Sequence, residues 1–119
     1  MVSEKSESIA LARWLEKSNL TFIHVPNEGR RSPRGGAILK RMGLKKGFPD
    51  FLIFDVPPGR EVKGVAVELK TPKGRLTRDQ QRWLRSLRNL GWIALSGDYY
   101  DIRDRLEALY RGNARVAST

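Results

Sequence analysis

Two carboxylates and one lysine mark the ends of a short stretch that has the pattern of a β-hairpin. Asp50 follows a proline, and after 17 further residues Glu68 and Lys70 occur with one residue between them. Successive side chains of a strand point to opposite faces, so Glu68 and Lys70 share a face. Folding the stretch back on itself sets residues near 50 opposite residues near 68. The sequence therefore predicts that Asp50, Glu68 and Lys70 converge at one place.

Carboxylates in this arrangement suit a hard metal ion. Asp50 and Glu68, together with a backbone carbonyl and water, offer the oxygen ligands that suit Mg²⁺ or Mn²⁺ rather than zinc. Such an ion lowers the pKa of a bound water and offsets negative charge on a phosphate. Lys70 would orient the attacking water, help to take its proton or stabilise the transition state. A salt-bridged hairpin on the surface of a sheet is the alternative interpretation.

The charge of the whole chain indicates a polyanionic partner. The 119 residues carry a formal net charge of +10, and the isoelectric point is near 10.5. Nucleic acid is the first candidate for such a partner. The length fits one domain, and no apolar run approaches the roughly 20 residues of a membrane span. The chain has no cysteine and no signal-peptide pattern, so we expect a cytoplasmic protein without disulfides or thiolate zinc sites.

A basic, glycine-rich segment precedes Asp50. Residues 29–47 contain no acidic residue, and residues 37–42 have the character of a short helix that ends at Gly43. Because these cations lead directly to Asp50, we expect them to hold a phosphate backbone beside the carboxylates. A mobile, solvated loop is the alternative. With two cations of the turn after Lys70 added, the predicted DNA contacts are Arg30, Arg31, Arg34, Lys40, Arg41, Lys45, Lys46, Lys73 and Arg75.

An amphipathic helix is predicted over residues 3–17. Glu7 lies on the same stripe as Leu11, Trp14 and Leu15. A carboxylate on an otherwise apolar stripe can reach inward to a site. It can equally interact with the helix dipole near a frayed end, and the pattern does not separate these roles.

A second helix begins after Thr77. Thr77 and Gln80 match the T-x-x-Q capping box, Leu84, Leu87 and Leu90 continue an apolar stripe, and a glycine follows. Gln80 stands one turn into this helix, where it would reach the site or serve only in the cap. Arginines on another stripe of the helix would follow a phosphate backbone or remain solvated.

The remaining elements complete a mixed sheet. Residues 21–25 are a strand candidate, residues 92–95 a buried strand and residues 98–111 a last helix. Residues 113–119 have nothing to bury and are expected to form a flexible tail. The predicted order, helix, strand, short helix, two strands, helix, strand and helix, gives an α/β fold with helices flanking a mixed β-sheet.

Taken together, these pieces resemble the VRR-NUC domain, a branch of the PD-(D/E)XK nuclease superfamily. The resemblance covers nearly the whole chain, so residues 1–119 are interpreted as a single domain. Each short motif is common, and the combination is specific. It consists of Asn-Glu-Gly at 27–29, Gly-Phe-Pro-Asp at 47–50, Val-Glu-Leu-Lys at 67–70, Gly-Arg-Leu-Thr at 74–77, Gln80, Trp83-Leu84 and Gly91.

The resemblance implies a restriction-endonuclease-like core and metal-dependent cleavage of DNA phosphodiester bonds. It implies that Asp50, Glu68 and the backbone carbonyl of Leu69 bind Mg²⁺ or Mn²⁺, and that Lys70 is the catalytic lysine. Stand-alone members look like dimeric, structure-selective nucleases that include Holliday-junction resolvases. The implied partners are therefore branched DNA, such as a four-way junction, and a second copy of the chain.

Two further site residues follow from the same resemblance. A glutamate of the first helix commonly completes the site in this superfamily, and Glu7 matches it, with Glu4 as the alternative. Gln80 matches the family's glutamine after the Glu-x-Lys strand. Trp14, Tyr99 and Tyr100 are the candidate anchors of a dimer interface, unless they only complete the core.

Two other functions compete with a DNA endonuclease. A non-catalytic DNA-binding module would keep the nuclease fold, but it has no need for Asp50, Glu68 and Lys70 together. A nuclease directed at flaps or RNA would use the same residues, so the sequence does not separate it from a DNA endonuclease. Cleavage that depends on metal distinguishes an enzyme from a binding module.

Overall fold

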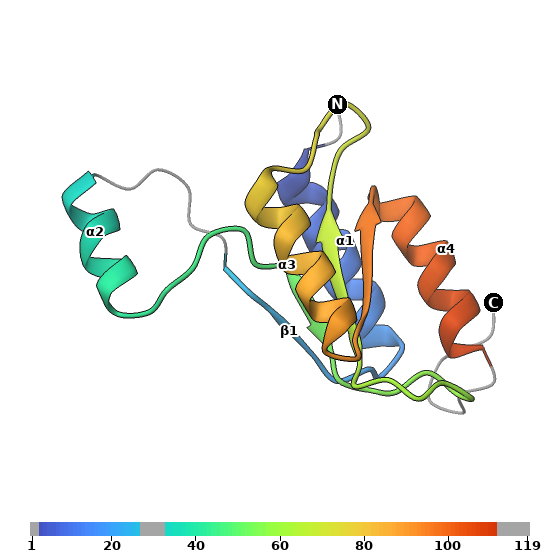
Figure 1. Cartoon of the computed structure of the whole chain (residues 1–119). Coiled ribbons are helices and arrows are strands. Elements are labelled where there is room, and N and C mark those ends of the chain that lie inside the picture. The colour runs from blue at the N-terminus through green and yellow to red at the C-terminus, as the bar shows by residue number, and fades with distance from the viewer. Residues whose placement is uncertain (1–2, 27–32, 112–119) are drawn as a thin grey trace.

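The computed structural model describes residues 3–26 and 33–111 of the chain. Four helices and four strands follow one another in the predicted order (Figure 1). They are α1 (Glu4–Lys17), β1 (Phe22–His24), α2 (Pro33–Arg41), β2 (Phe51–Ile53), β3 (Val65–Leu69), α3 (Arg78–Asn89), β4 (Ile93–Gly97) and α4 (Tyr99–Tyr110).

The strands form one mixed sheet in the order β1-β2-β3-β4. β2 is antiparallel to both β1 and β3, whereas β3 and β4 are parallel. Phe51 is paired with Val67, and extending this register by one step sets Asp50 opposite Glu68. The predicted hairpin and its register are therefore confirmed.

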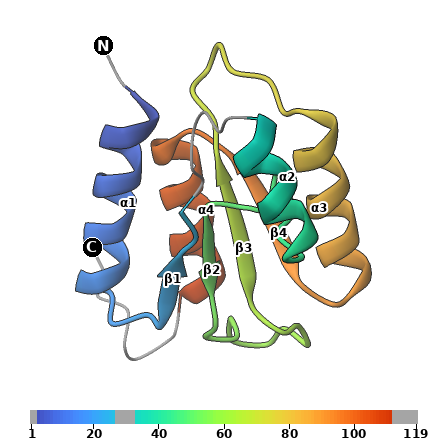
Figure 2. The ribbon, with the colours of Figure 1, turned by 90° about the vertical axis from the view of Figure 1, so that its left-hand side faces the viewer.

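Helices cover both faces of this sheet. Leu11 and Leu15 of α1 and Ile102 of α4 pack with Val67 and other residues of β2 and β3 on one face. Leu84 of α3 packs with residues such as Ala66 and Ala94 on the other face. Figure 2 shows α3 in front of the sheet and α4 behind it. The predicted α/β fold with a helix-flanked mixed sheet is confirmed.

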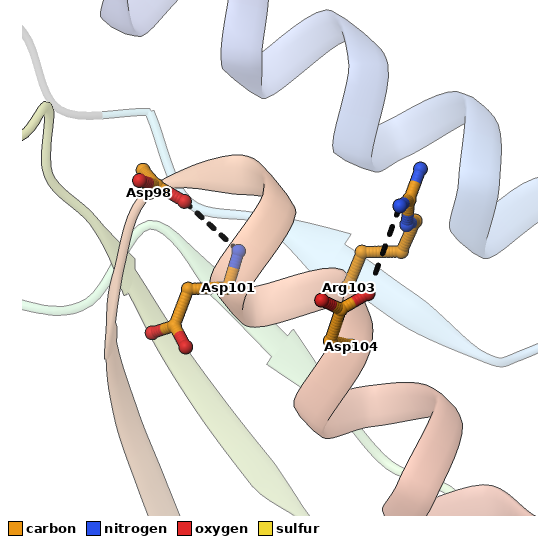
Figure 3. A network of polar contacts seen from close by, with 4 residues as sticks. All are labelled: Asp98, Asp101, Arg103 and Asp104. Carbon is orange, nitrogen blue, oxygen red and sulfur yellow. Dashed lines mark hydrogen bonds and ion pairs between the residues drawn. The ribbon is translucent and has the colours of Figure 1, made fainter.

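Side chains cap the N-termini of α1, α3 and α4. Ser3 caps α1 in a capping box with Ser6. Thr77 and Gln80 form the predicted box at the start of α3. At the start of α4 the Asp98 carboxylate accepts the Asp101 N–H over 2.9 Å (Figure 3). Each cap satisfies backbone donors that have no partner within the helix.

The short helix in the basic segment is longer than predicted. α2 begins at Pro33, a residue suited to a first helical turn because its missing N–H has no intrahelical partner there. Gly43, with φ +90°, ends the helix, as the N–H groups of Gly43 and Leu44 bond back to the carbonyls of Lys40 and Leu39. Figure 1 shows α2 standing apart from the layers around the sheet.

Two predictions about the second half of the chain are wrong. The strand predicted over residues 92–95 begins at Ile93 and continues to Gly97. It was predicted to be buried, but within β4 only Ala94 is buried, because β4 lies at the edge of the sheet. Leu90 is exposed because it is the C-cap of α3.

Residues 113–119 lie outside the described residues. No helix in residues 3–26 and 33–111 combines the length and apolar character that a bilayer crossing requires.

Candidate active site

Asp50 lies against the carboxyl end of β3. Its Oδ2 accepts a hydrogen bond from the Leu69 N–H over 2.8 Å. β2 begins only at Phe51, and extending the register two steps beyond it sets Pro49 opposite Leu69. The side chain of Asp50 thus takes the Leu69 N–H at the point where the ladder of β2 and β3 stops. This bond fixes the carboxylate beside the residue between Glu68 and Lys70.

The Leu69 carbonyl points to the same side of β3 as the Leu69 N–H. The Lys70 N–H bonds to the Gly97 carbonyl of the β4 side, and main-chain groups of successive strand residues point in opposite directions. Both main-chain groups of Leu69 therefore face the β2 side, where Asp50 lies. Pro49 has no N–H to donate to this carbonyl. The proline before Asp50 thus leaves the Leu69 carbonyl oxygen without a backbone donor from the opposite residue of the ladder.

Glu68 and Lys70 lie on the face of the sheet that α3 covers. Ala66 packs on the α3 side and Val67 and Leu69 on the α1 and α4 side, so alternation places Glu68 and Lys70 with Ala66. Glu68 is 2% exposed, and Lys70 is half-buried. The structure thus gathers Asp50, Glu68 and Lys70 at one end of β3, as predicted.

The segment before Asp50 is anchored to the start of α3. Trp83 Nε1 donates to the Lys46 carbonyl over 3.0 Å, and the Phe48 ring meets the Trp83 ring edge-on at 4.9 Å. Gly47, with φ +83°, approaches α3 so closely that a Cβ there would lie 2.8 Å from the Gln80 nitrogen. Only glycine fits this backbone and this approach. These contacts hold the chain that carries Asp50.

The Gln80 side chain takes part in the N-terminal capping box of α3. Its Oε1 accepts the Thr77 N–H over 2.9 Å, and its own N–H donates to Thr77 Oγ1 over 3.1 Å. Gln80 is buried, and its backbone nitrogen lies against Gly47 of the Gly-Phe-Pro-Asp segment. The capping role is confirmed, and a direct role of Gln80 in chemistry stays a prediction.

Glu7 approaches the same end of the sheet from the opposite face. Its Oε1 accepts the Tyr99 N–H at the start of α4, and Tyr99 follows soon after Gly97, which pairs with Leu69. Glu7 is 3% exposed, and its Oε2 has no hydrogen-bond partner among the described residues. No local sequence pattern predicts this contact, because 92 residues separate Glu7 from Tyr99.

The donors present fit a hard divalent cation with a partly aqueous shell. Residues 3–26 and 33–111 contain no cluster of three or more His, Asp or Glu side chains arranged to hold a metal. Asp50, Glu68 and the Leu69 carbonyl offer three hard oxygens, which suits Mg²⁺ because it keeps several waters and takes few protein ligands. The buried Oε2 of Glu7 lies near that end of the sheet, but Glu7 does not form a three-carboxylate cluster with Asp50 and Glu68.

Exposed cations lie on the chain segments before Asp50 and after Lys70. Lys40, Arg41, Lys45 and Lys46 are exposed along α2 and the turn that leads to Asp50, and Lys73 and Arg75 are exposed in the turn after Lys70. Arg30 and Arg31 lie outside the described residues, as do the side chains of Arg34 and Glu4. The exposure of these side chains does not test their contacts with nucleic acid, so the DNA contacts stay a prediction.

Comparison with known families decides the family of this chain. The family model for the VRR-NUC domain matches residues 2–95, which include Asp50, Glu68 and Lys70. The chain belongs to the VRR-NUC domain family. A solved structure named "VRR_NUC domain protein" is similar to this VRR-NUC domain with a TM-score of 0.71 and 20% sequence identity. The similarity covers 91% of this chain and 88% of that one. No curated protein matches this VRR-NUC domain.

Proposed function

We propose that this protein is a Mg²⁺- or Mn²⁺-dependent, structure-selective DNA endonuclease that hydrolyses phosphodiester bonds. The observation that carries the proposal is the Asp50 carboxylate on the Leu69 N–H, with Glu68 and Lys70 on either side of Leu69. Membership of the VRR-NUC family, a nuclease-type domain, supports it. The net charge of +10 favours a polyanionic substrate.

Each residue of the site has a distinct role in this proposal. Asp50, Glu68 and the Leu69 carbonyl would hold the metal, and Glu7, which approaches from the opposite face, is the candidate for a further ligand. The metal supplies charge compensation at the scissile phosphate and lowers the pKa of a bound water. Lys70, on the same face as Glu68, orients the attacking water and offsets the charge of the pentacovalent transition state.

The burial of Glu68 strengthens its electrostatic interactions. Glu68 is almost fully buried, and charge–charge interactions are stronger in the protein interior than in water. A divalent cation there offsets the cost of keeping two carboxylates close together. In the alternative, a salt-bridged hairpin without metal, Lys70 alone would offset the negative charge of the two carboxylates. The Leu69 carbonyl would then have no metal to bind.

We further propose that the enzyme resolves four-way junctions as a homodimer. A junction has two-fold symmetry and needs two cuts, and a two-fold dimer supplies two sites. Tyr100 is 62% exposed and remains a candidate anchor, whereas Trp14 and Tyr99 pack against the core. Ile38, Met42 and Leu44 on and after α2 are exposed apolar residues available to a second copy. Light scattering at micromolar concentration tests the assembly, and a monomer that makes paired symmetric cuts contradicts it.

A cleavage panel tests the catalytic proposal. Labelled duplex, flap and four-way junction DNA, and a matched RNA, are incubated with Mg²⁺, Mn²⁺ or EDTA. We expect cutting of the junction with either metal and none with EDTA. Glu68→Gln is the matched control because it keeps the shape and removes the charge. Metal-independent cutting, or equal cutting by Glu68→Gln, contradicts the proposal. Binding without any cutting favours the non-catalytic DNA-binding module. Preferential cutting of the flap or of the RNA would replace the four-way junction as the proposed substrate.

A further inference from the structure

A hollow lies at the β4 edge of the sheet, on the side that α3 covers. Its volume is about 380 Å³. Ser96 of β4 forms part of its wall, α3 forms another part, and α4 contributes one residue. The described residues that line it are Leu76, Gln81, Leu84, Arg85, Arg88, Ser96 and Arg105.

Three exposed arginines line this hollow, and no acidic residue is among its described lining residues. Arginine stays charged at every physiological pH, so Arg85, Arg88 and Arg105 repel one another without an anion between them. Arg105 has one nearby counter-charge, since its Nε lies 3.6 Å from Asp101 Oδ1. The hollow therefore favours an occupant with negative charge.

A hydrogen bond orients one guanidinium group, and an ion pair lies beside another. Arg88 Nη2 donates to the Ala94 carbonyl over 2.7 Å, and Arg105 Nε lies 3.6 Å from Asp101 Oδ1. A guanidinium has five N–H donors, so each group keeps donors for a ligand. Gln81 and Ser96 add an amide and a hydroxyl. Planar, pre-oriented arginine donors with neutral hydrogen-bonding groups are the chemistry that recognises phosphate.

The hollow is next to the catalytic strand. Ser96 is paired with Glu68 in the register of β3 and β4, and paired residues of neighbouring strands lie about 5 Å apart and on the same face. Ser96 therefore points to the face that carries Glu68 and Lys70. A phosphate in the hollow would neighbour the scissile phosphate on the same nucleic acid.

We infer that the hollow of Arg85, Arg88 and Arg105 is a binding site for a phosphate of the nucleic-acid backbone, separate from the metal site and from the cations around α2. It rests on the proposed function, because it names a second place where the substrate is held. A phosphate bound there holds the nucleic-acid strand that runs from the scissile bond across the β4 edge of the sheet. Phosphate contacts of this kind fix register and carry no base information.

A salt titration of duplex binding in EDTA tests the site without any cleavage. The test variant is Arg85→Ala with Arg105→Ala, which spares Arg88 and its bond to Ala94. The matched control is Arg13→Ala with Lys17→Ala, because these exposed cations of α1 do not line the hollow. We expect the test variant to bind roughly tenfold more weakly and to lower the slope of log affinity against log salt by about 1. We expect little change in the control.

Inorganic phosphate distinguishes a built site from diffuse charge. In an NMR titration of the wild-type protein, we expect the Nε–H signals of Arg85, Arg88 and Arg105 to shift together and saturate, and the Arg13 signal to stay in place. Equal losses of slope in both double variants, or no saturable shift, overturn the inference. Because both readouts are independent of metal, loss of cleavage in Glu68→Gln with unchanged binding in the test variant would leave the nuclease standing and remove this site alone.

Discussion

The Asp50 carboxylate accepts the Leu69 N–H over 2.8 Å, so one side chain both closes the end of the sheet and presents an oxygen to the candidate metal. The second oxygen, Oδ1, is left for other ligands. Pro49 makes the arrangement possible, since a residue with an N–H opposite Leu69 would bond to the Leu69 carbonyl and extend the ladder. Structure and chemistry are therefore coupled at Asp50, and substitutions can separate them.

Asp50→Asn and Asp50→Ala separate the two roles. Asparagine keeps an oxygen that accepts the Leu69 N–H, whereas alanine leaves that partly buried donor without its partner. We expect Asp50→Ala to lower the free energy of unfolding by about 1–3 kcal/mol and Asp50→Asn to stay closer to the parent. Both should lose cleavage, because neither carries the charge that holds the metal. Urea denaturation and a junction-cleavage assay measure the two effects, and full activity of Asp50→Asn would remove Asp50 from the metal site.

Lys70→Ala should slow the chemical step by roughly a hundredfold or more, as loss of a general catalyst or a charge stabiliser does. Metal and DNA affinity should change little, because Asp50 and Glu68 remain. Lys73→Ala is the matched control, since Lys73 is exposed in the next turn. Single-turnover cleavage at saturating enzyme reports the chemical step directly. Equal rates for the two variants would show that Lys70 has no special role.

Local chemistry explains why much of the site was predictable. Strand alternation and the turn at 57–60 placed Asp50 opposite Glu68, and the T-x-x-Q pattern placed Gln80 in a cap. Both depend on residues close in sequence or on one hairpin. The hydrogen bond between Glu7 and Tyr99 depends on the packing of α1 against α4, which no local pattern encodes.

The basic segment and the edge strand show the same limit. Gly35 and Gly36 hide the helical character of the residues after Pro33, because glycine disfavours a helix interior. The length of β4 depends on its parallel pairing with β3, a contact across the intervening α3. The hollow of three arginines joins two helices and a strand, so arginine spacing along α3 revealed only part of it.

Removing the described cations of α2 and its turn should weaken DNA binding for all sequences. The variant carries alanine at Lys40, Arg41, Lys45 and Lys46. Each lost phosphate contact should lower the slope of log affinity against log salt by about 0.9. A control with the same charge change carries alanine at the exposed Arg13, Lys17, Arg60 and Lys63. Binding titrations at several salt concentrations decide it, and an unchanged slope in the α2 variant would exclude this segment from the interface. The predicted contacts Arg30, Arg31 and Arg34 are tested in the same way.

Tyr110 should make the fold sensitive to alkaline pH. Its side chain is fully buried and donates to the Asp55 carbonyl over 2.7 Å, and burial raises the pKa of Tyr110 above the usual 10.0. Below pH 10 the phenol is neutral in both states, so this stability is fully present. Above pH 10 the unfolded state loses the proton first, and stability falls by up to about 1.4 kcal/mol per pH unit. Urea midpoints from pH 8 to 11 should fall more steeply for the parent than for Tyr110→Phe, and parallel curves would contradict this.

Glu7→Gln distinguishes a metal ligand from a structural anchor. Glutamine keeps an oxygen that accepts the Tyr99 N–H, but it removes the charge and replaces the buried Oε2. If Glu7 completes the metal site, as we propose, stability should stay near that of the parent while the Mg²⁺ concentration for half-maximal cleavage rises at least severalfold. Glu7→Ala should lose stability as well, by about 1–3 kcal/mol, because the Tyr99 N–H loses its acceptor. Parental metal dependence in Glu7→Gln, together with the stability loss in Glu7→Ala, would assign Glu7 to holding α4 against α1 and leave Asp50 and Glu68 as the metal ligands.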